Sequence, residues 1–182
     1  MDRLIALILL VCLSPILTLL LIITLIDLQC NPVFVQKRTV TGASEFNFYK
    51  IRSMRKTAPE VPTGDFWAPH IHITRWGKFL RSNSLDELLN LISIVKGNMN
   101  FIGPRPIMPC EYELMKLRSS YNIRSKPGIT GLAQVNGRDL ITITRKVACE
   151  RIYERRKASV IFRLCILLKT AEIVLKKTGV TH

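Results

Sequence analysis

The sequence lacks the cysteine and histidine patterns that mark disulfide frameworks and common metal or nucleophilic sites. Its five cysteines are scattered, and no two of them form a C-x-x-C pair. Such a set argues against a disulfide framework or a zinc site and fits a reducing compartment, so all five are interpreted as structural. No H-E-x-x-H or Ser-His-Asp pattern is visible, and His70 and His72, in an expected loop, are interpreted as non-ligands.

Acidic residues are also scarce. The chain of 182 residues has 13 Asp and Glu against 27 Lys and Arg, which gives a formal net charge of +14, and residues 31–182 form a strongly basic body. A basic body beside an apolar run indicates anionic partners: phospholipid head groups, nucleic acid or a phosphorylated substrate. Because no aromatic stacking platform accompanies the charge, no specific nucleic-acid partner is expected.

Only one long hydrophobic run is present, and this excludes a multipass transferase. The run from Leu4 to Ile26 has no charged residue and is long enough to span a bilayer, which takes about 20 residues. Ser14-Pro15 lies near its centre. Proline removes one backbone hydrogen bond and bends a helix, and the serine can satisfy the carbonyl that proline leaves free. The residues alone favour equally a kinked spanning helix and a re-entrant hairpin, both with the basic body on the cytoplasmic side.

The remaining sequence predicts an α+β, mainly helical fold that comprises a small β-hairpin and interfacial amphipathic helices. Strands are expected at 32–40 and 46–54, a loop at 57–70, helices within 72–82 and at 84–95, 110–121 and 142–157, and a glycine-punctuated loop at 126–138. The amphipathic segment 160–179 fits either a core-packing helix or one in the membrane interface, and we favour the interface. We expect a membrane segment at 1–30 and one catalytic unit at 31–182.

The stretch that contains Asp86 and Glu87 has two interpretations. Ser84 and Glu87 have the spacing of a capping box, in which the serine caps the helix and the glutamate reaches back to it. That reading leaves Asp86 with only a weak favourable interaction with the helix dipole, about 0.3–1 kcal/mol. The other reading makes Asp86-Glu87 a catalytic pair, and this window alone favours the capping box.

Cations and backbone-restricting residues gather elsewhere in the chain. Arg105 lies between two prolines, which restrict the backbone on both sides, and arginine matches phosphate oxygens with two hydrogen bonds. Lys50 lies in a predicted strand, and Arg138 ends the glycine loop, whose glycines would let backbone amides approach a ligand. A carboxylate pair, several cations and a membrane segment together fit chemistry on a diphosphate at a lipid surface. The alternative is a non-catalytic membrane scaffold of a glycan assembly complex.

At this point the sequence resembles the bacterial sugar transferases, also called monotopic phosphoglycosyl transferases. The resemblance rests on Ser14-Pro15 and on five stretches that occur in the family's order: "PVFVQKR", "FYKIRSM", "ITRWGKFLRSNSLDELLNL", "KGNMNFIGPRP" and "KPGITGLAQVNGR". Each stretch is weak by itself, but together they cover nearly the whole chain and are highly specific.

The resemblance implies a reaction. Such enzymes move a sugar-1-phosphate from a UDP-sugar to polyprenol (undecaprenyl) phosphate and release UMP, in the first membrane step of surface glycan or glycoconjugate synthesis. They use Mg²⁺ and an Asp-Glu pair, whose aspartate is taken to form a covalent phospho-sugar intermediate. Asp86 matches that aspartate and Glu87 its partner, with Glu87 the candidate magnesium ligand. Lys50, Arg81, Arg105 and Arg138 match positions thought to bind the nucleotide diphosphate or to shape the site.

The family's Ser-Pro pair breaks a re-entrant helix, so the resemblance favours a monotopic anchor at the cytoplasmic face of the bacterial inner membrane. The expected form is the minimal catalytic one, with homodimerisation and contact with downstream glycosyltransferases both left open. Three features depart from the family pattern. The basic pair that usually precedes Asp2 is absent, Glu150 and Tyr153 stand as approximate counterparts of an Asp-Tyr stretch, and Arg163 occupies a position where an acidic residue is expected.

Overall fold

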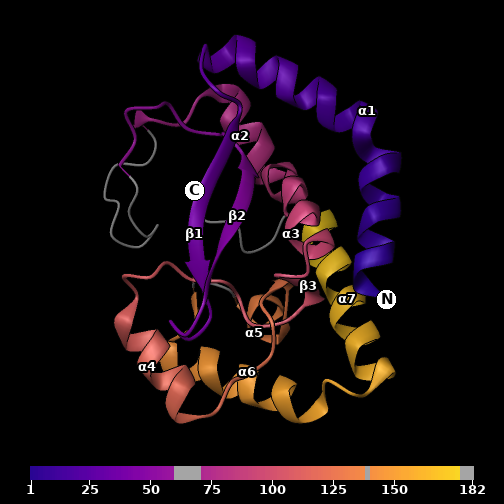
Figure 1. Cartoon of the computed structure of the whole chain (residues 1–182), viewed down its shortest axis with the longest axis vertical. Helices are drawn as coiled ribbons and strands as arrows, with labels where there is room; N and C mark the ends of the chain where they lie inside the picture. Colours follow the sequence, from indigo (N-terminus) through magenta and orange to yellow (C-terminus); the bar gives the residue numbers. More distant parts are fainter. Residues whose placement is uncertain (60–70, 138–139, 177–182) are drawn as a thin grey trace.

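The computed structural model describes residues 1–59, 71–137 and 140–176. Figure 1 shows the long helix α1 along one side, the hairpin in the middle, and α4 and α6 at the end away from the C-terminal half of α1. The elements in chain order are α1 (Asp2–Leu28), β1 (Val33–Thr39), β2 (Glu45–Ile51), α2 (Arg75–Ser82), the 3-10 helix η3 (Leu85–Asn90), α3 (Leu91–Val95), β3 (Asn100–Ile102), α4 (Tyr112–Ser120), β4 (Gly128–Thr130), α5 (Leu132–Val135), α6 (Ile143–Arg156) and α7 (Val160–Lys176).

Helix α1 is a single helix that contains Pro15, and it is not divided into two separate half-helices. Among the described residues it is the one helix long and apolar enough to cross a membrane. Its ribbon nevertheless changes direction along its length (Figure 1), as expected for a helix with an internal proline. Pro15 has no N–H to donate to the Val11 carbonyl, and the Ser14 hydroxyl donates to that carbonyl instead, at 2.7 Å. The predicted role of this serine is confirmed.

Both ends of α1 contact the rest of the protein. At its start, one oxygen of Asp2 accepts a hydrogen bond from the Phe101 backbone N–H at 3.3 Å, and the other pairs with Arg163 at 3.3 Å. At its end, Asp27 accepts a hydrogen bond from the Thr74 hydroxyl at 2.6 Å. The two ends of the apolar helix are therefore tied to the same body of the protein.

The β-hairpin is confirmed, and it positions the 3-10 helix that follows α2. Strands β1 and β2 pair antiparallel, with Phe34 opposite Lys50 and Arg38 opposite Phe46. The side chain of Asn90, at the end of η3, accepts a hydrogen bond from the Tyr49 backbone N–H at 3.0 Å. Since Asn90 is fully buried, this bond holds η3 against β2 at the residue next to Lys50.

The predicted loop 126–138 is wrong in part, because its described residues include strand β4 and helix α5. Strand β4 pairs parallel with β3, and the glycines serve this close backbone packing. A Cβ atom added at Gly128 would lie 2.1 Å from the Gly103 nitrogen, and one at Gly131 would lie 2.0 Å from the Gly103 oxygen. The closest neighbour of each of these two glycines is thus a backbone atom of Gly103, where we had expected a ligand.

Helices α2, α4 and α6 confirm the predicted helices at 72–82, 110–121 and 142–157, with shorter bounds. The described part of the C-terminal segment, α7, is a helix in which Ile166 is the only buried residue. Large apolar side chains of α7 remain exposed, among them Ile161, Leu168 and Leu175. A helix with this exposed face does not have the burial of a core-packing helix.

Candidate active site

The segment that contains Asp86 and Glu87 is helical, but the predicted capping box does not form. Ser84 has a left-handed backbone with φ of 54°, and its side chain makes no capping hydrogen bond to the described residues. The expected helix 84–95 is instead a 3-10 turn followed by the short helix α3, which starts only at Leu91. The left-handed serine does not have the extended backbone that a capping residue requires.

The carboxylates of Asp86 and Glu87 share one cation. The Nζ atom of Lys50, on β2, lies 3.0 Å from Oε1 of Glu87 and 3.6 Å from Oδ2 of Asp86. The side chains of Asp86, Glu87 and Lys50 are 9%, 16% and 24% exposed, so the cluster is largely removed from water. Three residues that the sequence singled out are thus brought together by the docking of η3 on the hairpin.

Burial raises the pKa of Asp86 above its usual value, and the neighbouring Glu87 raises it further. Lys50 and Arg81 oppose this effect, because positive charges favour the ionised carboxylate. In this structure the groups that favour its ionised form are the cations, since burial works against it.

Arg105 faces the same cluster and is joined by Arg38, which we had not predicted. A narrow cavity is lined by Lys50, Glu87, Arg105 and Arg38 among others. Burial and the neighbouring Arg105 lower the pKa of Arg38 to about 10, so its guanidinium stays charged at neutral pH. The register of the hairpin is the signal that could have identified Arg38. Residues 34, 36 and 38 lie on the same face of the hairpin as their partners 50, 48 and 46, so Arg38 and Lys50 share that face.

A buried ion pair supports the backbone of Arg105. Arg118, on α4, donates from Nε to Glu150 on α6 at 2.8 Å and makes a second bond to the same carboxylate. Arg118 also donates to the backbone carbonyl of Arg105 at 2.9 Å and to that of Val40 at 3.2 Å. Glu150, an approximate family counterpart, is therefore linked to the Arg105 backbone through Arg118.

The other predicted residues lie as follows. Arg138 and His70 are outside the described residues. His72 lies 3.2 Å from the Thr57 hydroxyl, and Ser14 and Pro15 lie within α1. Tyr153 is buried and donates a hydrogen bond to the Ile102 carbonyl at 2.8 Å, which ties α6 to β3.

A magnesium site was predicted at Glu87. Within the described parts of the chain, no group of three or more His, Cys, Asp or Glu side chains could hold a metal ion. Asp86 and Glu87 nevertheless fit Mg²⁺, because this ion is commonly held by one or two carboxylates together with substrate phosphates and water.

Taken together, an apolar anchor helix and a buried carboxylate pair among cations define a class of membrane-associated protein suited to chemistry on phosphate groups. The sequence profile of one family, described as bacterial sugar transferase, matches residues 1–177. The chain belongs to this bacterial sugar transferase family, which confirms the resemblance.

The chain is also similar to several curated proteins whose names describe sugar transferases. The chain is 34% identical over 158 residues to the galactosyl transferase CpsE of Streptococcus agalactiae, covering 81% of this chain and 35% of that protein. It is 36% identical over 166 residues to the UDP-glucose:undecaprenyl-phosphate glucose-1-phosphate transferase of Xanthomonas campestris, covering 82% and 33%. An uncharacterized sugar transferase, EpsL of Bacillus subtilis, is 30% identical over 179 residues, covering 98% and 87%. The chain thus spans about a third of the length of the first two relatives.

Proposed function

We propose that this protein transfers a sugar-1-phosphate from a UDP-sugar to polyprenol phosphate and releases UMP. The observation that carries the proposal is the buried Asp86 carboxylate held beside Glu87 by Lys50, in a member of the bacterial sugar transferase family. The Xanthomonas relative is named for a reaction of this class.

In the first step, a carboxylate oxygen of Asp86 attacks the phosphorus that carries the sugar. The bond from this phosphorus to the bridging oxygen breaks, and the electron pair leaves on UMP. A covalent phospho-sugar remains on Asp86. Because an anion attacks an anionic diphosphate, the reaction requires positive charge around the phosphates. Lys50, Arg38 and Arg105 line the cavity beside Glu87 and supply this charge.

In the second step, a phosphate oxygen of polyprenol phosphate attacks the same phosphorus. The bond from phosphorus to Asp86 breaks, so the free carboxylate is restored and polyprenol-diphosphate-sugar is released. The first step needs an ionised Asp86 and the second releases Asp86 as a carboxylate, and Lys50 and Arg81 favour that ionised form against the effect of burial. Bound Mg²⁺, with Glu87 as its protein ligand, would add further positive charge at the phosphate oxygens.

The helix contacts favour the re-entrant topology over a spanning one. A helix that crosses a bilayer separates its ends by about 30 Å of hydrocarbon. Here Asp2 and Asp27, at opposite ends of α1, bind Phe101 and Thr74 of the same basic body. The basic body lies on the cytoplasmic face of the bacterial inner membrane in this proposal, with the apolar side chains of α7 in the interface.

The experiment that tests the function is UMP release by the full chain in detergent, with polyprenol phosphate, Mg²⁺ and a panel of UDP-sugars. Wild type should release UMP with one or more sugars, and Asp86→Asn should release none. Glu45→Gln, an exposed carboxylate-to-amide change on the same hairpin as Lys50, is the matched control and should stay active.

The covalent intermediate is tested by omitting the acceptor. Wild type should then release about one UMP per active enzyme molecule and gain the mass of one phospho-sugar. Near wild-type turnover by Asp86→Asn would refute the nucleophile. A folded wild-type protein that releases no UMP with any sugar would favour the scaffold alternative.

A further inference from the structure

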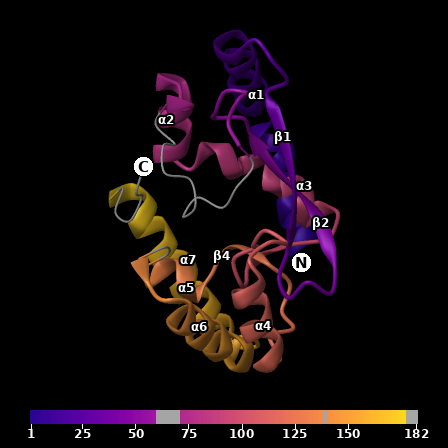
Figure 2. The same ribbon diagram turned by 90° about the vertical axis from the view of Figure 1, so that its left-hand side faces the viewer.

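A second, larger cavity lies next to the carboxylate pair. Its volume is ≈ 270 Å³, and its lining comes from α1, η3, α3, β3, β4, α5 and α7, together with residues near the end of α2. Figure 2 shows that α5, α6 and α7 lie on one side of the protein and α1, the hairpin and α3 on the other, and the cavity is lined from both groups of elements.

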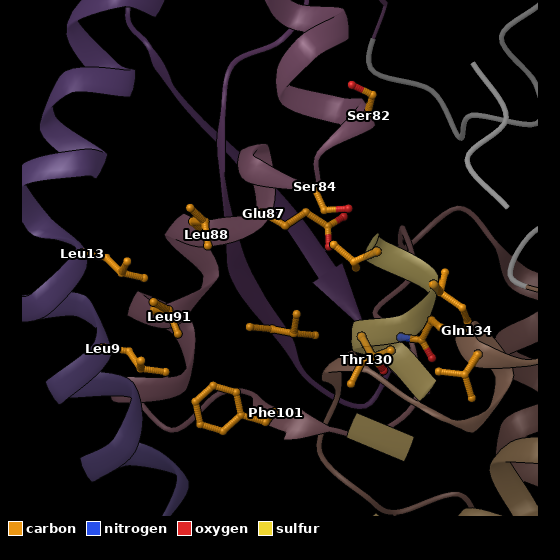
Figure 3. A pocket seen from close by; sticks show the side chains of 15 residues that line it. Leu9, Leu13, Ser82, Ser84, Glu87, Leu88, Leu91, Phe101, Thr130 and Gln134 are labelled. Carbon is orange, nitrogen blue, oxygen red and sulfur yellow. Dashed lines mark hydrogen bonds between the residues drawn. The ribbon is translucent and has the colours of Figure 1, made fainter. Parts of the chain in front are cut away.

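The lining of this cavity is mostly apolar, and its polar residues are Ser82, Ser84, Glu87, Thr130, Gln134 and Thr170. Figure 3 shows Leu9, Leu13, Leu88 and Leu91 on one side, and Glu87, Ser84, Thr130 and Gln134 toward the other. The leucines at 9 and 13 come from the membrane helix. The cavity is therefore amphipathic, and its apolar wall includes the element expected to lie in the lipid.

Glu87 lines two neighbouring cavities. It lines the amphipathic cavity and also the narrow cavity that contains Lys50 and Arg105. An anionic head group at the polar side of the larger cavity would therefore lie next to the cations of the active site, while its hydrocarbon lay against α1.

Gln134 independently offers a buried, unpaired polar group to a ligand in this cavity. Its side chain is buried, at 7% exposed, and neither its amide nitrogen nor its amide oxygen has a hydrogen-bond partner among the described residues. Leaving a buried polar group unpaired lowers the stability of the folded protein. A phosphate oxygen that accepts from the Gln134 amide would satisfy the donor.

The volume suits a short piece of an isoprenoid. A protein cavity of about 150 Å³ lined by apolar side chains binds benzene, which has six carbons. At the same packing, ≈ 270 Å³ holds about eleven carbons. This is about two isoprene units.

We propose that this cavity is the acceptor subsite, which binds the first two isoprene units of a polyprenyl phosphate against Leu9, Leu13, Leu88 and Leu91. Its phosphate lies toward Glu87 and Gln134, ready to attack the phospho-sugar on Asp86. This inference rests on the proposed function. The rest of the chain extends along the exposed apolar side chains of α1 and α7, which include Ile8 and Leu175.

Measuring the two half-reactions separately distinguishes a defect in acceptor binding from a defect in the transfer chemistry. Leu9→Trp fills the apolar side of the cavity, and Gln134→Met removes the polar amide at nearly constant volume. Both variants should form the phospho-sugar intermediate and release the first UMP like wild type, because that step needs no acceptor. In full turnover, the KM for polyprenyl phosphate should rise about tenfold or more, and the KM for the UDP-sugar should stay constant. Ile152→Trp, at an exposed position of α6 away from this surface, is the matched control.

A photo-crosslinking experiment on the wild-type protein locates the bound polyprenyl phosphate directly. A polyprenyl phosphate that carries a diazirine on its first isoprene unit should label peptides containing Leu9–Leu13 or Leu88–Leu91 of the wild-type protein. An excess of unlabelled polyprenyl phosphate should abolish the labelling.

Three results would overturn the inference and leave the proposed function intact. These are an unchanged acceptor KM in both variants, labelling of other peptides alone, and equal competition by phosphatidylglycerol vesicles, which would make an ordinary membrane lipid the occupant. Absence of UMP release by wild type with any donor would instead refute the proposed function.

Discussion

The ion pair between Arg118 and Glu150 yields the sharpest prediction about stability. Both side chains are almost fully buried, at 1% and 3% exposed, and two hydrogen bonds join them. Glu150→Gln keeps the shape but leaves the Arg118 charge without its counter-ion. Removing one partner of such a pair costs about 3–5 kcal/mol. For a chain of this length, each 1 kcal/mol shifts the melting temperature by about 2–4 °C, so we expect a fall of about 6–20 °C.

The double variant Arg118→Met/Glu150→Leu separates stability from function. It removes both charges, so thermal unfolding in detergent should recover most of the loss. The Arg105 carbonyl would still lack its hydrogen bond from Arg118, and the KM for the UDP-sugar should remain raised. A loss below about 1 kcal/mol in Glu150→Gln would refute the reasoning, because it would mean that the pair is not buried in solution. Restored KM in the double variant would show that Arg118 does not position Arg105.

Four further predictions concern the active site and helix α1. Asp86→Asn should be inactive yet melt at a higher temperature than wild type at pH 7. A carboxyl whose pKa is raised by folding stabilises the protein fully below its unfolded pKa and loses that contribution as the pH rises through its folded pKa. A lower melting temperature at pH 7, with no convergence toward wild type near pH 3, would contradict this. Arg38→Gln should raise the KM for the UDP-sugar about tenfold, while Lys37→Gln, the neighbouring strand position, serves as the control and should not. Excess EDTA should stop UMP release and added Mg²⁺ should restore it, and full activity in EDTA would remove the magnesium proposal. Pro15→Ala restores an N–H for the Val11 carbonyl and should favour a straight, spanning α1; an N-terminal cysteine that is still labelled only from the cytoplasmic side would count against this role of Pro15.

Local patterns predicted most of the elements because they depend on neighbouring residues. Helix α6 is an example. Its capping residue Thr142 stabilises the first turn, because the Thr142 side chain accepts a hydrogen bond from the Arg145 backbone N–H. The hairpin likewise follows from its alternating strands. The capping box failed although its residue types were right, because Ser84 takes a left-handed backbone at the junction of α2 and η3. That conformation is not visible in the four residues themselves, since Ser84 lies where α2 has ended and η3 begins.

The sequence by itself determined that this is a basic protein with one long apolar run, and its ordered motifs identified the family. It also singled out Asp86, Glu87, Lys50, Arg81 and Arg105 as candidates. Only the tertiary structure decided that Lys50 lies between the two carboxylates, that Arg38 joins them, and that Arg118 supports Arg105 from a distant helix. The reason is physical: these contacts join residues far apart in the chain, and their distances depend on the packing of whole elements. The cavity between α1 and α7 has the same origin, since no single segment contains both of its walls.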